Sequence, residues 1–346
     1  MLKIVRPLVY LATRTYCKNP AQLKYTVSPT CHLNVTLPYK TVVKPLDPLD
    51  HPNNDKVIIN CPDHKDIIVN QIDTTINIQN QSSEFKNNVL CEIIAPITAN
   101  LNITTVGDLT VGNFCGDAMR LFSDKGHVTI GKSKNEYITA KTNDGNIVTD
   151  GDVQAAKVVL KSTKGDIVTN KLKCLGLHLE SNSGKIVTSS SYCDESYFVT
   201  KTGTLDLQNV HKNSKILMGD NGILNMVGFD GVLDVAMQKG SANIHISRLD
   251  KNSRIVIHEE GTMTLCVSEE LLQSTCIEIS SRCCEVQEGI EHHEDEETGF
   301  ISIKPKGDKL ENVKLVVTCP KSLVNVKVAN WSEMMQKIIQ NKAQIN

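Results

Sequence analysis

Aromatic residues, net charge and long apolar runs are all scarce in this chain. Aromatic residues make up only 4% of its 346 residues, so the flat rings on which single-stranded nucleic acids and sugars stack are few. The formal net charge of -2 argues against a dedicated nucleic-acid surface, because such surfaces are strongly basic. No stretch approaches the roughly 20 apolar residues that a helix needs to span a bilayer. We therefore expect a soluble mature protein with no transmembrane segment and no nucleic-acid partner.

Recognisable catalytic motifs are also missing. The sequence contains no Gly-x-Ser-x-Gly elbow, no phosphate-binding glycine loop and no His-Glu-x-x-His pair. Some β-helix enzymes cleave acidic polysaccharides with carboxylates and a basic residue on one outer face, and Asp206, Asp234 and Lys215 suggest that arrangement. These three residues do not share one column of the repeat described below. We expect no enzymatic activity, no catalytic residues and no cofactor.

The twelve cysteines are dispersed along a chain far longer than small disulfide-rich scaffolds. Most of them are expected to be small buried hydrophobic residues. The densest group of potential metal ligands is Cys276, Cys283, Cys284, His292 and His293. Thiolates and imidazoles suit zinc, but the group lacks a Cys-x-x-Cys pair, and adjacent cysteines rarely bind one ion together. We expect no metal site, with Cys283, Cys284, His292 and His293 as the weak candidates.

What the chain does contain is a repeat of a glycine followed, two residues later, by an apolar residue. The steps between successive repeats are 19, 19, 20, 19, 19, 19, 18 and 21 residues. Such a steady period indicates identical structural units stacked in a row. The repeat glycines are Gly107, Gly126, Gly145, Gly165, Gly184, Gly203, Gly222, Gly240 and Gly261.

Two positions of the repeat are always apolar, which predicts side chains that point into a shared interior. The residues two positions after the glycine are Leu109, Val128, Ile147, Ile167, Ile186, Leu205, Leu224, Ala242 and Met263. The residues five positions before it are Leu121, Ala140, Leu160, Leu179, Phe198, Leu217, Val235 and Val256.

Five successive repeats place a hydroxyl residue three positions before the glycine: Ser123, Thr142, Ser162, Ser181 and Thr200. We interpret this pair as a tight corner, in which the hydroxyl bonds nearby backbone and the glycine adopts positive φ. The residue after the glycine changes from Asp108 to His127 and Asn146. The aspartates at this position are therefore expected to be turn residues and not calcium ligands.

Two folds could carry this pattern. In a parallel β-helix each period is one coil, whereas in an antiparallel meander each period is a hairpin with a loop such as residues 142–145. Thr149, Thr169 and Thr188 recur four residues after successive glycines, and parallel coils would stack them directly on one another. We therefore predict an all-β, single-stranded parallel β-helix of about nine regular coils over residues 107–265.

The units Gly107-Asp108-Leu109-Thr110-Val111 and Ser162-Thr163-Lys164-Gly165-Asp166-Ile167-Val168 resemble the adhesin repeat of bacterial surface proteins. The whole chain is similar to the animal proteins grouped as family with sequence similarity 185. These resemblances imply a β-helical domain and residence in mitochondria. They transfer no catalytic or binding residue to this sequence.

The flanking segments lack the glycine register. The first residues combine Lys3, Arg6, Arg14 and Lys18 with apolar and hydroxyl residues, and no acidic residue precedes Asp47, which is typical of a mitochondrial transit peptide. We expect the peptide at 1–16, an extended proline-punctuated segment with one strand at 17–56, irregular β-rich coils or a cap at 57–106, an acidic loop and β cap at 266–329, and an amphipathic helix at 330–346. The helix would cover the open end of the solenoid or dock a partner.

The resulting hypothesis is a non-catalytic interaction or scaffold protein of the mitochondrial matrix, which contacts protein partners through the flat faces of its solenoid. The first alternative is a secreted adhesin-like binding protein. The second is a carbohydrate-active β-helix enzyme. Secretion would require that the short apolar run from Leu8 to Ala12 act as a signal peptide, and a cytoplasmic location is the remaining possibility.

Overall fold

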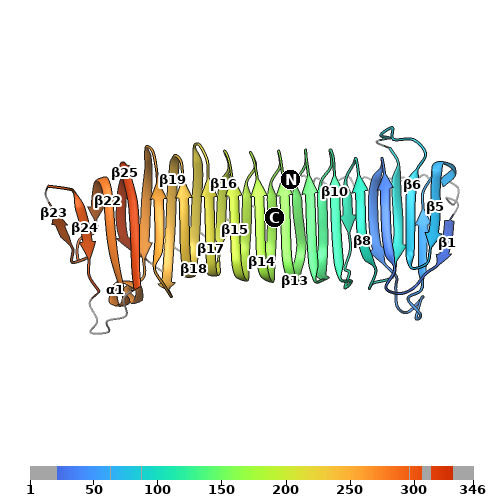
Figure 1. Ribbon diagram of the computed structural model, residues 1–346, viewed down its shortest axis with the longest axis horizontal. Helices are drawn as coiled ribbons and strands as arrows, with labels where there is room; N and C mark the ends of the chain where they lie inside the picture. Colours follow the sequence, from blue (N-terminus) through green and yellow to red (C-terminus); the bar gives the residue numbers. More distant parts are fainter. Residues whose placement is uncertain (1–21, 63, 87, 296, 306–312, 330–346) are drawn as a thin grey trace, which may run out of the picture.

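The computed structural model describes residues 22–62, 64–86, 88–295, 297–305 and 313–329. These residues form a long rod in which the strands lie side by side across the long axis (Figure 1). The expected transit peptide at 1–16 and the expected helix at 330–346 lie outside the described residues. No helix among the described residues has both the length and the apolar character needed to cross a membrane.

The regular section is a parallel β-helix. Each coil places one stretch before its corner glycine in a first sheet and one stretch after it in a second sheet, and all neighbouring coils pair in parallel. The predicted architecture is confirmed, and the hairpin alternative is wrong for this section. Its strands are β8 (Asn100–Thr105), β9 (Leu109–Val111), β10 (Ala118–Ser123), β11 (Val128–Lys134), β12 (Tyr137–Thr142), β13 (Ile147–Ser162), β14 (Ile167–Ser181), β15 (Ile186–Thr200), β16 (Thr204–Gln208), β17 (His211–Met218), β18 (Gly222–Met237), β19 (Gly240–Leu249), β20 (Ser253–Ile257) and β21 (Gly261–Val267).

The apolar column after the glycine lies in the core. Ile167 pairs in register with Ile147 and Ile186, and all three are fully buried. The threonine column is confirmed in the same way, because Thr169 pairs with Thr149 and Thr188. Like side chains therefore stack on like along the rod.

The residues five positions before the glycine are buried in the core as predicted, with two exceptions. Leu217 and Val256 are only half-buried and lie on the outer face, whereas Ile216 and Ile255 occupy the core. The pairing of Phe198 with Ile216 shows the reason. The corner that follows Ile216 is one residue longer than the one that follows Phe198, so counting back from Gly222 reaches the wrong residue.

The corner glycines are required by close packing. A Cβ atom at Gly145, Gly165, Gly184 or Gly203 would overlap the carbonyl oxygen of the corner glycine one coil earlier. The expected positive φ is wrong for this column except at Gly240, where φ is 135°. Backbone thus packs directly on backbone along one edge of the rod, and a side chain in that edge would push the coils apart.

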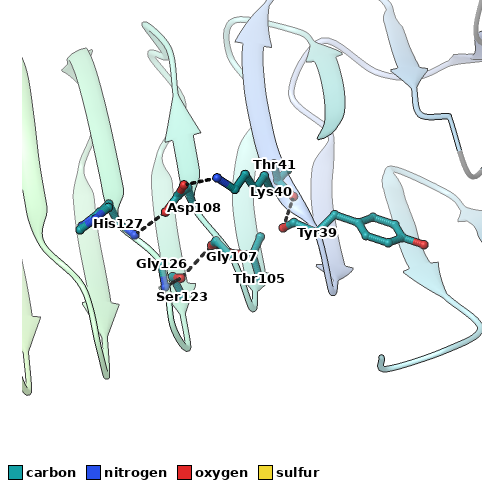
Figure 2. Close-up of polar contacts among 9 residues, drawn as sticks. All are labelled: Tyr39, Lys40, Thr41, Thr105, Gly107, Asp108, Ser123, Gly126 and His127. Carbon is teal, nitrogen blue, oxygen red and sulfur yellow. Dashed lines mark hydrogen bonds and ion pairs between the residues drawn. The ribbon is translucent and has the colours of Figure 1, made fainter. Parts of the chain in front are cut away.

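The corner hydroxyls connect successive coils. Ser162 Oγ accepts a hydrogen bond from Gly165 N at 2.8 Å and donates one to the carbonyl oxygen of Gly145, one coil earlier, at 2.9 Å. Ser123 repeats this arrangement with Gly126 and Gly107, as Figure 2 shows. Ser123, Ser162 and Ser181 each bond one backbone group in their own coil and one in the coil before, whereas Thr142 bonds only the coil before.

The residue after each corner glycine forms a second ladder. The side chain of Asp108 accepts the backbone N–H of His127 at 3.0 Å, and its other oxygen lies 3.1 Å from Lys40 Nζ (Figure 2). His127 Nδ1 accepts the N–H of Asn146 at 3.0 Å, and Asn146 Oδ1 accepts that of Asp166 at 2.9 Å. Asp, His and Asn are interchangeable here because each offers an acceptor to the next coil.

The amino-terminal coils stack out of sequence order. The strand β2 pairs in parallel with both β6 and β8, and β3 pairs with both β7 and β9, so that the blue strands of Figure 1 lie between β6 and β8. The described part of segment 17–56 holds three strands instead of the one expected. The elements are β1 (Gln22–Thr26), β2 (His32–Leu37), β3 (Lys40–Pro45), β4 (Lys56–Asn60), a 3-10 turn (His64–Asp66), β5 (Ile67–Ile72), β6 (Thr75–Asn80) and β7 (Leu90–Ala95).

The carboxyl-terminal coils also stack out of sequence order. The strand β25 pairs in parallel with β20 and β21 on one side and with β22 on the other. The β cap expected within 266–329 contains the long strand β25, and it also contains the helix α1, which the sequence did not predict. The elements are α1 (Glu269–Ser274), β22 (Thr275–Val286), β23 (His293–Asp295), β24 (Phe300–Ile303) and β25 (Val313–Val328).

Antiparallel strands occupy the outer positions at both ends of the described rod. At the first end β5 pairs with β6 and β1 pairs with β4, and at the other β24 pairs with β22 and β23 with β24. A short turn suffices to add an antiparallel strand, whereas another parallel strand needs a full crossing. These strands therefore end the stack with little additional chain.

Replacing Gly165 with alanine tests the glycine corner. The new Cβ would overlap the backbone of Gly145, so we expect a loss of about 1–3 kcal/mol, as for overpacking in a core. Gly176→Ala is the matched control, because a Cβ there meets only Lys157 Cγ at 3.9 Å. Urea unfolding of both variants measures the effect. Equal stability of the two variants would show that the corner tolerates a side chain.

The Asp108 ladder predicts a pH effect. Partial burial raises the pKa of Asp108, but the N–H of His127 and the ammonium of Lys40 lower it further, so the pKa lies below its usual value. A carboxylate of this kind stabilises the fold above its unfolded pKa of about 3.9, and the contribution is lost as the pH falls through the folded pKa. Below about pH 4 the wild type should therefore lose stability more steeply than Asp108→Asn.

Urea unfolding midpoints measured between about pH 2.5 and pH 7 test this expectation. Asp144→Asn, at an exposed carboxylate, serves as the control and should keep the steep acid dependence of the wild type. An Asp108→Asn variant that follows the wild-type curve throughout would contradict the ladder's electrostatic role.

Candidate functional site

A groove of about 500 Å³ lies on the outer face of the first sheet, across β13, β14, β15, β17 and β18. The outward-facing residues of its lining alternate along each strand, because side chains on one face of a strand are two residues apart, and the buried Leu177, Ser196 and Ser214 lie between them. It is lined by Lys157, Gly176, Leu177, His178, Glu195, Ser196, Tyr197, Asn213, Ser214, Lys215, Val232 and Asp234.

One register column forms the chemically rich side of the groove. His178 pairs with Tyr197, Tyr197 with Lys215, and Lys215 with Asp234. The His178 and Tyr197 rings meet edge to face with centroids 4.9 Å apart. The column thus presents an imidazole, a phenol, an ammonium and a carboxylate in a row.

Two carboxylates of the outer face, Asp234 in this column and Glu180 in the adjacent one, are held by partners on the same face. Arg254 binds Asp234 with two hydrogen bonds of 2.7 and 3.0 Å. Lys161 Nζ lies 2.5 Å from Glu180. This contact holds the pKa of Glu180 below its usual value, opposed by partial burial and assisted by His178 at 3.0 Å. At neutral pH the rim therefore carries fixed charges of both signs.

An aliphatic column runs beside the groove. Val199, Leu217, Ala236 and Val256 are register neighbours and all are half-buried on the outer face. Val199, Leu217 and Ala236 also line a second hollow of about 320 Å³. The two columns are two residues apart along each strand, so they form one continuous surface, which we call the groove face.

The coils of β15 and β17 contain buried hydroxyl groups without partners in the described part of the chain. Thr188, Ser191 and Thr200 of β15 and Ser214 of β17 are buried, and their hydroxyl oxygens have no hydrogen-bond partner among the described residues. Leaving a buried polar group unpaired costs roughly 1–3 kcal/mol. We expect these two coils to open more readily than their neighbours.

A second aromatic group lies at the bend between the sheets. Tyr192 and His211 stack with centroids 4.6 Å apart, and His211 Nδ1 is 2.8 Å from Asp230. Lys171 Nζ lies 5.9 Å from the centre of the Tyr192 ring. These residues do not line the groove.

The residues singled out from the sequence are distributed differently from expectation. Lys215 and Asp234 are direct register partners, so the statement that they share no column is wrong for this pair. Asp206 lies in the second sheet, where Lys185 and Asn225 bind its carboxylate. The three residues therefore do not meet in one site.

The weak metal candidates lie near the carboxyl-terminal end of the rod. Cys283 and Cys284 belong to β22, His293 belongs to β23, and His292 Nδ1 contacts the carbonyl oxygen of Ile290 at 3.0 Å. Burial, with Cys283 and Glu294 nearby, raises the pKa of the Cys284 thiol to about 11. Within the described ranges no three His, Cys, Asp or Glu side chains form a group able to hold a metal ion.

Sequence reasoning missed His178 and Tyr197 as groove residues. Their separation of 19 residues was a usable signal, because residues one period apart fall in one column. Following the outer columns as closely as the inner ones would have found them.

The Toastrack DUF4097 family matches residues 102–311, more than half of the chain. The chain belongs to this family. The match begins in β8 and extends past β24, so it contains the toastrack coils that carry the groove face. It excludes the out-of-order strands of the amino-terminal coils.

Solved structures with low sequence identity are also similar to this toastrack chain. A candidate adhesin from Bacteroides fragilis is 13% identical with a TM-score of 0.34, and the match covers 89% of this chain and 96% of that one. A candidate adhesin from Parabacteroides distasonis is 12% identical with a TM-score of 0.38 and coverage of 71% and 92%. A candidate cell adhesion protein from Clostridium sporogenes is 9% identical with a TM-score of 0.21 and coverage of 90% and 100%. These matches do not bear on the narrower animal family.

Proposed function

We propose that this protein is a non-catalytic, adhesin-like binding protein that contacts a protein partner through its groove face. The observation that carries the proposal is the continuity of the face. An aromatic and charged column lies directly beside an aliphatic one on parallel strands in fixed register. Protein interfaces combine such aromatic and aliphatic anchors with a polar rim.

Binding explains the groove better than catalysis does. Both carboxylate oxygens of Asp234 already accept hydrogen bonds from Arg254, so neither is free to act on a bound substrate. Glu180 is similarly engaged by Lys161 and His178. Groups paired in this way are suited to recognising charge on a partner, since their positions are already fixed.

A double variant, Tyr197→Ala with Leu217→Asp, tests the groove face. It removes the half-buried ring of Tyr197 and places a charge in the aliphatic column, so we expect partner labelling to fall at least tenfold. Val168→Asp, a half-buried aliphatic residue on the outer face of the second sheet, is the matched control. Proximity labelling in intact cells, with the labelling enzyme fused to each variant, provides the measurement.

Proteins labelled by the wild type and by Val168→Asp should be lost together from the double variant. If a folded double variant, verified by circular dichroism, labels the same proteins as the wild type, the groove face is not the contact surface.

The cellular compartment is a separate part of the proposal. The basic, acid-free start of the sequence favours import into mitochondria, whereas an adhesin-like protein would be secreted. A fluorescent fusion with residues 1–20 intact should localise to mitochondria, and Arg6→Glu with Arg14→Glu should abolish that location. Entry of the unaltered fusion into the secretory pathway, or its retention in the cytosol, would exclude the matrix.

A further inference from the structure

Two cysteines from successive coils meet beside the groove. Cys174 of β14 and Cys193 of β15 are direct register partners in parallel strands. Neighbouring strands are about 4.8 Å apart, which falls within the Cα separation that a disulfide accepts. Their Sγ atoms lie 2.9 Å apart, and both cysteines are free.

The surroundings make this pair unequal. Cys174 is 8% exposed and Cys193 is fully buried. Either thiol can donate the hydrogen bond between them. With Cys174 as the donor, this bond lowers the pKa of Cys193 against the effect of its burial and, together with burial, raises the pKa of Cys174. Cys193 is therefore the better thiolate nucleophile, and Cys174 is positioned to react with it.

We propose that Cys174 and Cys193 are an oxidation site, at which a peroxide converts the two thiols into a disulfide that joins adjacent coils. The site is independent of any partner at the groove face. It is nevertheless close to it, since Gly176 and Glu195 of the groove lie two residues beyond the two cysteines. The new bond would hold β14 and β15 together at the groove's edge.

The chemistry needs only a peroxide as the oxidant. The Cys193 thiolate attacks one oxygen of hydrogen peroxide, the O–O bond breaks, and the departing hydroxide takes a proton to become water. Cys193 is then a sulfenic acid. Sγ of Cys174 attacks Sγ of Cys193, the S–O bond breaks, and the hydroxide leaves as water with the proton of Cys174. Two thiols and one peroxide thus yield one disulfide and two waters.

Access to the buried thiol comes from its own coil. Cys193 lies between Ser191 and Thr200 on β15, where buried hydroxyls lack partners. Local opening of this coil would admit a molecule as small as peroxide. Cys61 and Cys91 form an internal comparison, because Cys61 raises the pKa of Cys91 by a side-chain hydrogen bond but both are fully buried.

Mass spectrometry of the full-length, reduced protein tests the site without any substitution. The protein is treated with hydrogen peroxide, blocked with N-ethylmaleimide and digested with trypsin without reduction. Cleavage after Lys173, Lys185 and Lys201 places the two cysteines on separate peptides, 174–185 and 186–201. We expect these peptides to be joined, with a mass two hydrogens below their sum, and to separate after dithiothreitol.

The linked peptide should exceed a Cys61–Cys91 link at least tenfold at low peroxide. It should be absent from Cys193→Ser, while Cys115→Ser, at an exposed cysteine, should leave it unchanged. Hydrogen exchange of the amides around Gly176 and Glu195 should slow in the oxidised wild type. The proposal would be overturned if Cys174 and Cys193 were recovered as thiols blocked by N-ethylmaleimide under conditions that already oxidise the exposed Cys115 and Cys283. A link that forms only after denaturation would do the same.

Discussion

Contact between the backbones of successive corner glycines is the constraint on which the rest of this structure depends. At Gly145, Gly165, Gly184 and Gly203 no room exists for a Cβ atom, because the preceding glycine's carbonyl oxygen occupies that space. The close approach brings the corner hydroxyls within reach of two coils at once. It also sets the coils in one register, and the aliphatic and threonine columns follow from that register. The sequence period is thus the number of residues that the chain needs to return to this packed edge after each coil.

A fixed register has a functional consequence on the outside of the rod. Any residue type placed one period apart becomes a row of neighbours, so a short change in a few coils creates an extended surface. The row from His178 to Asp234 arises in this way, and so does the aliphatic row from Val199 to Val256. The inner columns must remain apolar to fill the core, whereas the outer columns are free to acquire recognition chemistry. The groove face needs no loop insertion to exist.

The inner columns could be predicted because they repeat a single physical requirement. Ile167 and Ile186 are buried as their positions indicated, whereas Leu217 is not, since one extra corner residue shifts the count and no residue type marks the insertion. The coil of β2 and β3 lies between coils from later in the chain, an order that depends on pairing between distant strands and leaves no local pattern. The pairing of Lys215 with Asp234 required the true register, which glycine spacing alone missed by a residue.

The position of the groove face along the rod has a physical explanation. The corner hydroxyl column runs from Ser123 to Thr200 and then gives way to Met218 and Met237. At this change Thr200 has lost the bonds that Ser162 and Ser181 make, and the corner before Gly222 is longer. Coils on the two sides of this change differ in their corner residue and in their corner length, so their strands cannot stack identically. The hollow on the outer face and the unpaired hydroxyls beneath it both lie where the corner residue changes from Ser or Thr to Met. Opening of the sheet there would disrupt fewer hydrogen bonds than opening among the regular coils, because Thr200 makes none of the corner bonds that Ser162 and Ser181 make.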